Sequence, residues 1–118
     1  MRFLTLYKPA AAESDLPPTR QEMAKMGKLI EDMTKTGTLL STEGCAPSAK
    51  GARVRLSDGK FTVIDGPFTE AKEIIGGFAI IQANSREEAI QLSKNFLNVA
   101  GDGESEIRLL CEMSDFAP

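Results

Sequence analysis

Asp65 is the residue of this sequence best placed to do chemistry. It follows an apolar run and begins the segment Asp65-Gly-Pro-Phe68. A partly buried carboxylate at a strand end can act as a general base, bind a cation or bind a substrate hydroxyl. The same Asp-Gly-Pro order is typical of a turn, in which the aspartate accepts local backbone N–H groups. Asp65 is therefore a candidate catalytic or ligand-binding residue, with turn architecture as the alternative.

Charged side chains near Asp65 are further candidates for binding a small polar or anionic molecule. Glu70, Lys72 and Glu73 follow it closely, and a lysine between carboxylates can position a polar ligand or relay a proton. Arg55 and a second arginine two residues earlier share one face of a predicted strand, where they could hold an anion. In both cases the alternative is a solvated surface cluster.

A tyrosine and two cysteines complete the set of candidates. Tyr7, the only tyrosine, ends the first predicted strand and could point its hydroxyl into a cleft or pack at the edge of the core. Cys45 lies in a predicted loop, and the sequence leaves the exposure of its thiol open. Cys111 alternates with predicted core positions, which predicts a buried, inert thiol. Neither lies in a motif that activates cysteine.

The chain contains no histidine. Imidazole is the commonest proton-transfer group near neutral pH and the commonest metal ligand. Its absence excludes zinc catalysis, Ser-His-Asp hydrolysis and Cys-His chemistry within one chain. We therefore predict no metal and no cofactor, and the sequence leaves open whether the chain is an enzyme.

Length and composition predict a single domain over residues 1–118. The 14 lysines and arginines are outnumbered by 17 aspartates and glutamates, which disfavours nucleic-acid binding. The longest apolar runs are too short to span a membrane. Two cysteines without framework spacing, and no recognisable secretion signal, predict a cytoplasmic location.

Hydrophobic periodicity predicts the elements that position these residues. Strands are expected over 2–7, 38–42, 53–57, 60–64, 74–83 and 104–113, and helices over 19–37 and 85–101. Both helices begin with a capping box, Thr19 with Glu22 and Ser85 with Glu88. The order β-α-β-hairpin-β-α-β predicts an α+β ferredoxin-like sandwich, with two helices on one face of an antiparallel sheet.

The hairpin has the most specific local signal. Asp58-Gly59 favours a two-residue type I′ turn. That turn places Val54 opposite Val63 and Leu56 opposite Phe61 on one face, with the two arginines on the other. On the first helix, Met23, Met26, Ile30 and Met33 form an apolar stripe. Core packing is the favoured interpretation of this stripe, and a soft ligand surface is the alternative.

An ordered series of motifs resembles the DGPF family of the YCII-related group over nearly the whole chain. The series consists of Gly44, Pro47-Ser48, Gly51-Ala-Arg-Val-Arg55, Asp65-Gly-Pro-Phe-Thr-Glu-Ala-Lys-Glu73, Gly77-Phe78 and Ser85-Arg-Glu-Glu-Ala-Ile90. The resemblance implies a ferredoxin-like fold that dimerises by joining sheets, as in dimeric α/β barrels. Enzymatic activity has been suspected in the wider group because a His-Asp pair lies in a cleft. That proposal does not transfer to a chain without histidine, and Asp65 is the acid that falls on the named motif.

Three functions remain open at this point. The favoured one is a homodimeric module that binds a small polar or anionic molecule in a cleft near the DGPF turn, with Asp65, Lys72, Arg55, Glu73 and Tyr7 as candidate ligand-binding residues. A small histidine-free, metal-free enzyme with Asp65 as acid or base is the second. The third is a regulatory protein-interaction subunit, since relatives are often encoded near extracytoplasmic-function sigma factors. A dimer is expected on physical grounds too, because the helices cover only one face of the sheet.

Overall fold

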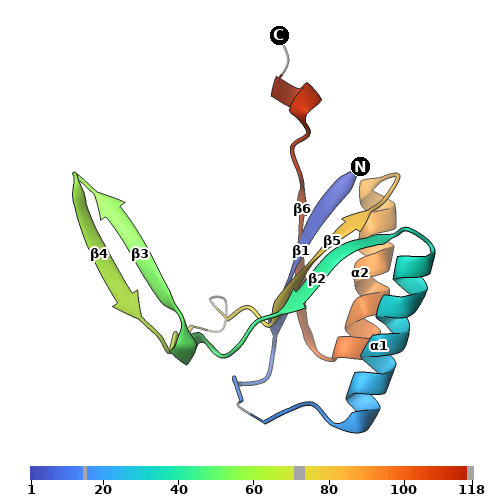
Figure 1. Cartoon of the computed structure of the whole chain (residues 1–118), viewed down its shortest axis with the longest axis horizontal. Helices are drawn as coiled ribbons and strands as arrows, with labels where there is room; N and C mark the ends of the chain where they lie inside the picture. Colours follow the sequence, from blue (N-terminus) through green and yellow to red (C-terminus); the bar gives the residue numbers. More distant parts are fainter. Residues whose placement is uncertain (15, 71–73, 117–118) are drawn as a thin grey trace.

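A four-stranded antiparallel sheet with two helices on one face forms the body of the chain (Figure 1). The computed structural model describes residues 1–14, 16–70 and 74–116. Its elements are β1 (Arg2–Pro9), α1 (Arg20–Lys35), β2 (Leu39–Gly44), β3 (Ala52–Ser57), β4 (Lys60–Asp65), β5 (Gly77–Gln82), α2 (Arg86–Ala100) and β6 (Gly103–Leu109). The strand order β2-β5-β1-β6 is that of a ferredoxin-like α+β fold, which confirms the predicted fold class.

The helix boundaries follow from their capping residues. The Thr19 and Ser85 hydroxyls accept hydrogen bonds from the backbone N–H groups of Glu22 and Glu88, as both capping boxes predict. At the end of α1, Gly37 adopts a φ of 75° and the next N–H bonds back to the Met33 carbonyl, a Schellman arrangement. Neither helix, within the described ranges, is long and apolar enough to cross a membrane.

The fully buried core is small and lies at one end of the space between sheet and helices. Phe3 and Ile81 from the sheet meet Ala83 and Ala89, and all four are at most 3% exposed. Helix α1 contributes no buried residue. Its Met33 packs against the edge of this cluster, so the predicted apolar stripe serves the core at only one of its four positions. The remainder of the interlayer space is therefore available for another role.

The hairpin forms a separate two-stranded sheet and does not join the body. Strands β3 and β4 pair in the predicted register, with Val54 opposite Val63 and Leu56 opposite Phe61. Asp58 and Gly59 have φ values of 50° and 76°, as a type I′ turn requires. We call residues Ala52–Asp65 the arm, because Figure 1 shows them projecting from the body on the side away from the helices.

The last strand is shorter than predicted, and the expectation of a buried Cys111 is wrong. Strand β6 ends at Leu109, and a 3₁₀ turn spans Met113–Phe116. The cause is the start of its neighbour, because β1 begins at Arg2 and its carbonyl accepts the Leu110 N–H. Beyond that point no described strand lies alongside, and Cys111 is exposed.

Candidate functional site

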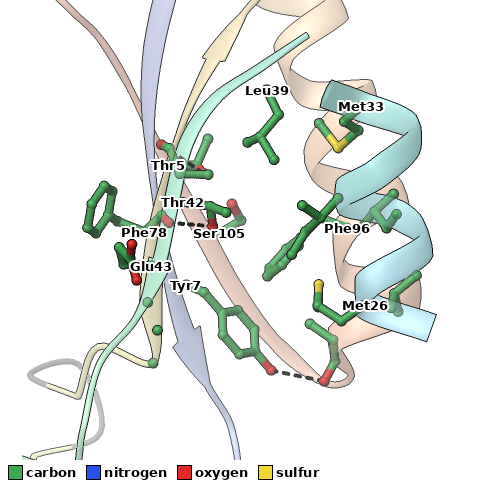
Figure 2. A pocket seen from close by; sticks show the side chains of 18 of the residues that line it. Thr5, Tyr7, Met26, Met33, Leu39, Thr42, Glu43, Phe78, Phe96 and Ser105 are labelled. Atoms are coloured by element: carbon green, nitrogen blue, oxygen red, sulfur yellow. Dashed lines mark hydrogen bonds between the residues drawn. The ribbon is translucent and has the colours of Figure 1, made fainter. Parts of the chain in front are cut away.

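A cavity of about 710 Å³ lies between the helix-covered face of the sheet and the two helices (Figure 2). Its walls come from the start and middle of α1, the C-terminal half of α2, and strands β1, β2 and β5. Apolar side chains supply most of the lining: Met23, Met26, Leu29, Ile30, Met33, Leu39, Ile81, Leu92, Phe96 and Val99. The volume falls within the range of small-molecule pockets, roughly 300–1,000 Å³.

The methionine stripe of α1 forms one wall of this cavity. In Figure 2, Met26 and Met33 project from α1 toward the space enclosed by the sheet. Helix α1 runs beside α2 and the start of β2, which leaves its apolar face set back from the centre of the sheet. Thioether side chains are flexible and polarisable, so they can adapt to the shape of a bound molecule.

Tyr7 lies at the end of the cavity near the last turn of α2. Its ring meets Phe96 edge to face at 5.3 Å between centroids. Its hydroxyl lies 3.3–3.5 Å from the carbonyl oxygens of Ala100, Gly101 and Asp102 and donates to this group. Burial, and then the negative charge of Asp102, raise the pKa of Tyr7. The phenol therefore stays protonated at neutral pH, and its oxygen keeps capacity to accept a hydrogen bond.

Ser93 is the second polar feature of the lining. Ser93 lies on the inward face of α2, four residues after buried Ala89, and is 7% exposed. Its hydroxyl is buried and has no hydrogen-bond partner among the described residues. A buried, unsatisfied hydroxyl costs about 1–3 kcal/mol. A ligand with a suitable donor or acceptor would remove that cost once the hydroxyl turns toward the cavity.

The predicted site residues are divided between the cavity and the arm. Tyr7 lines the cavity, whereas Asp65 and Arg55 lie on the arm and are absent from the described lining. Asp65 faces Ala52 at the base of the arm, on the side of Phe61 and Val63. Arg55 pairs with Thr62 on the opposite side. The hairpin register therefore directs the Asp65 and Arg55 side chains to opposite faces.

The remaining candidate residues are not brought together in one site by the described part of the chain. Lys72 and Glu73 lie outside the described residues, and Glu70 is exposed. Cys45, whose exposure the sequence left open, is exposed. Among the described residues, no cluster of carboxylates and cysteines is arranged to hold a metal ion.

The DGPF turn is fixed by Ser48. The Ser48 hydroxyl donates to the Glu13 carboxylate at 2.6 Å and accepts from the Phe68 N–H at 2.9 Å. The Ser48 N–H donates to the same carboxylate at 2.7 Å. A Cβ on Gly66 would overlap the Ser48 carbonyl, so this position needs glycine for close approach. We call Glu13, Ser48, Gly66 and Phe68 the clamp.

Within the clamp region, the Phe68 ring is covered by a cation. The Arg53 guanidinium carbon lies 3.8 Å from the ring centroid, a cation–π distance. Phe68 lies outside the buried cluster. The turn therefore joins the arm to the body through polar and cation–π contacts.

Sequence reasoning missed the cavity and Ser93. A serine at the i+4 position after a core alanine, and three residues before Phe96, is a detectable irregularity in the apolar face of α2. Periodicity places such a residue inward. It does not reveal whether the opposite wall lies close enough to fill the space.

Comparisons with known proteins cover most of the chain. A family model described as a YCII-related domain matches residues 1–114. "Uncharacterized protein R00369" of Rhizobium meliloti (strain 1021) is 32% identical over 99 residues, which are 83% of this chain and 77% of that protein. A solved structure of 5-chloro-2-hydroxyhydroquinone dehydrochlorinase (TftG) from Burkholderia phenoliruptrix AC1100, in complex with 2,5-dihydroxybenzoquinone, matches with a TM-score of 0.48 and 16% identity, covering 98% of both chains.

Proposed function

We propose that this chain, which belongs to the YCII-related domain family, binds a small, largely apolar and uncharged molecule between its sheet and its helices. The observation that carries the proposal is the cavity of about 710 Å³ with its apolar walls. Concave, mostly apolar spaces of this size with a few polar groups are typical of small-molecule sites. The lining residues Glu22, Met23 and Gly27 are exposed, so a ligand can enter from solvent.

The lining indicates the charge of the ligand. No lysine or arginine lines the described cavity, whereas Glu22 and Glu43 do. An anion would lose its hydration without gaining a cationic partner, which is strongly unfavourable. The cavity thus supports a neutral ligand, and the anionic ligand expected near the DGPF turn stays an untested prediction.

Two hydroxyl groups would orient the ligand. Ser93 can donate or accept, and protonated Tyr7 can accept while donating to the end of α2. A ligand with one hydroxyl or carbonyl group on an aromatic or aliphatic body matches this arrangement. Phe96, already in edge-to-face contact with Tyr7, supplies an aromatic surface for such a body.

A homodimer in the cytoplasm is part of the same proposal. Strand alternation relative to the core residues Phe3 and Ile81 puts Leu4, Leu6, Phe78 and Ile80 on the face of the sheet away from the helices, and a second copy is the simplest cover for it. The enzyme with Asp65 as acid or base, and the regulatory subunit, stay predictions. No described contact of Asp65 favours the enzyme over the binding module.

Gly27 offers a clean test of the cavity. It lines the cavity on α1, and a Cβ added there meets no atom within 4 Å. Gly27→Phe should fill the space, whereas Gly27→Ala should leave it open. Both substitutions should stabilise α1 by up to about 1 kcal/mol. The assay is a thermal-shift screen with neutral phenols and aliphatic alcohols, followed by calorimetric titration of any molecule that binds.

We expect one or more neutral probes to raise the Tm of the native chain and of Gly27→Ala but not of Gly27→Phe. Ser93→Ala should weaken binding roughly 3- to 10-fold through loss of one hydrogen bond, without lowering the stability of the empty protein. Equal responses from the two Gly27 variants, or no response of the native chain to any neutral probe, would contradict the proposal.

A further inference from the structure

The arm exposes a contiguous apolar face. Val54, Leu56, Phe61 and Val63 are 62–72% exposed, and cross-strand pairing joins them into one patch. In the described chain, β3 and β4 pair only with each other. A lone two-stranded hairpin is at best marginally stable in water, and apolar patches of this kind mark interaction sites. The arm therefore needs a second surface.

The accessible surface area of the chain exceeds that of a compact protein, and the excess indicates how much area an interface could cover. The accessible surface is 8701 Å², about 2,400 Å² more than the roughly 6,300 Å² expected for a compact protein of this mass. The radius of gyration is 16.4 Å, against about 13.5 Å for a compact chain of this length. A stable interface covers about 800 Å² per partner, so the excess is ample for one.

A matching apolar surface lies on the open face of the sheet. Phe3 and Ile81 face the helices, so strand alternation directs their neighbours to the other side. Figure 2 shows the Phe78 side chain on that side. Leu4 lies beside Ile80, and Leu6 beside Phe78. These four residues are the open-face strip.

Ion pairs border the open-face strip. Lys8 Nζ lies 3.0 Å from the Glu106 carboxylate at one end, and Arg2 Nε lies 2.8 Å from that of Glu112 at the other. Arg108 also pairs with Glu106 at 2.8 Å. An apolar centre inside a charged rim is the usual anatomy of a protein interface.

The clamp keeps the arm from folding back onto its own sheet. Gly66 donates to the Gly51 carbonyl at 3.1 Å and closes the base of the arm. Next to it, the Phe68 N–H is held by Ser48, which Glu13 holds in turn. With its base packed this tightly, the arm points away from the body (Figure 1). Its apolar face is thus available to another molecule.

We propose that the apolar face of the arm packs on the open-face strip of a second copy of this chain, and that the second arm does the same in return. The inference rests on the homodimer in the proposed function and names the surfaces that form it. Each chain presents one arm and one strip, so a two-fold axis satisfies both contacts with the same pair of surfaces. Two contacts of this kind also cover both apolar surfaces that a single chain leaves open.

Charge substitutions on the two faces of the arm test the proposal. Phe61→Glu places a carboxylate in the apolar patch, whereas Thr62→Glu, the matched control, places one on the opposite face. Leu6→Glu disrupts the strip. Sedimentation velocity over a concentration series should show a native dimer, an unchanged Thr62→Glu dimer, and dissociation constants raised at least about 30-fold for the other two variants. Circular dichroism and thermal melts confirm that each variant is folded.

Mixing the two defective variants separates arm exchange from other dimers. A heterodimer of Phe61→Glu with Leu6→Glu keeps one intact arm, from the Leu6→Glu chain, on one intact strip. The mixture should therefore form dimers at concentrations where each variant alone is monomeric. In dimers joined arm to arm, Leu6→Glu alone would still dimerise, and in dimers joined strip to strip, Phe61→Glu alone would; either result would contradict arm exchange.

The remaining outcomes distinguish a failure of arm exchange from a failure of the proposed function. A monomeric native chain would overturn both arm exchange and the homodimer, while ligand binding in the cavity is decided separately by the Gly27 variants. A native dimer that Phe61→Glu leaves intact would overturn arm exchange alone. Absence of dimers from the mixture would do the same.

Discussion

In the body, Phe3 and Ile81 are 3% exposed, whereas in the arm Phe61 and Val63 are 72% and 62% exposed. Both pairs lie on antiparallel strands with alternating side chains. The difference is the second layer: α2 covers one face of the body sheet, and the described part of the same chain offers no cover for the arm. The comparison shows that alternation assigns residues to a face, and that a second layer decides whether that face is buried.

The largest expected effect comes from truncating one phenylalanine in each region. Phe3→Ala should lower the free energy of unfolding by about 3–5 kcal/mol, because it removes a buried ring and leaves a cavity. Phe61→Ala should change it by less than about 0.5 kcal/mol in dilute, monomeric protein. Chemical denaturation at two protein concentrations measures both values.

Concentration sharpens this comparison. If the arm docks on a second copy, Phe61→Ala should become destabilising when the protein is concentrated enough to dimerise. Phe3→Ala should be costly at every concentration. Equal losses for the two variants in dilute protein would mean that the arm is buried within its own chain.

A smaller but still large effect is expected at the joint between body and arm. Gly66→Ala should lower the free energy of unfolding by about 3 kcal/mol, because the new Cβ meets backbone atoms of Ser48 that have little room to move. Gly51→Ala is the matched control, because its Cβ would lie 3.6 Å from the same carbonyl in ordinary contact. Thermal melts should separate the two by roughly 10 °C. Similar melting temperatures would show that the clamp is loosely packed.

The sequence predicts most of the body correctly because its signals are local. The N-caps at Thr19 and Ser85 and the type I′ turn depend on neighbouring residues, and they form as predicted. The helix and strand periods then give the element order and the fold class.

Errors and omissions occur where the outcome depends on distant elements. Cys111 alternates like a core residue, yet it is exposed because β1 starts too late to pair with that part of the chain. The apolar stripe on α1 would show the same helical period whether α1 packed directly on the sheet or left a cavity. Periodicity therefore could not reveal the cavity. Arg55 and Asp65 were both predicted to line a cleft near the DGPF turn, but the hairpin register directs their side chains to opposite faces.

Ser48 allows a finer test of how the arm is held. Ser48→Ala leaves the Phe68 N–H without its acceptor and removes one donor to Glu13, so a loss of about 1–2 kcal/mol is expected. Ser57→Ala, at the exposed end of β3, should cost less than about 0.5 kcal/mol. Denaturant titration of the two variants gives the difference, and an equal loss would exclude Ser48 as an anchor. Glu13→Gln should not add fully to Ser48→Ala, because the two residues share hydrogen bonds.

The smallest effect on stability is expected from the ionisation of Tyr7. Tyr7 lies in the body, so the body and not the arm should show this pH dependence. The chain has one tyrosine and no tryptophan, so the ultraviolet absorbance of tyrosinate reports on Tyr7 alone. Burial and the charge of Asp102 raise its pKa, and the absorbance midpoint in the folded protein should lie above the ordinary value of about 10. In denaturant the midpoint should return to that value.

The sign of the linkage follows from this shift. The folded state holds the Tyr7 proton more tightly than the unfolded state, so its contribution to stability is complete below the unfolded pKa. That contribution is lost as pH rises through the folded pKa. Tyr7→Phe should therefore flatten the alkaline decline in stability, whereas Phe61→Ala in the arm should leave its shape unchanged. A ligand that donates a hydrogen bond to the Tyr7 oxygen should lower the absorbance midpoint from its ligand-free value, because that bond is stronger with the phenolate than with the phenol. A midpoint unaffected by a bound ligand would place that ligand away from Tyr7.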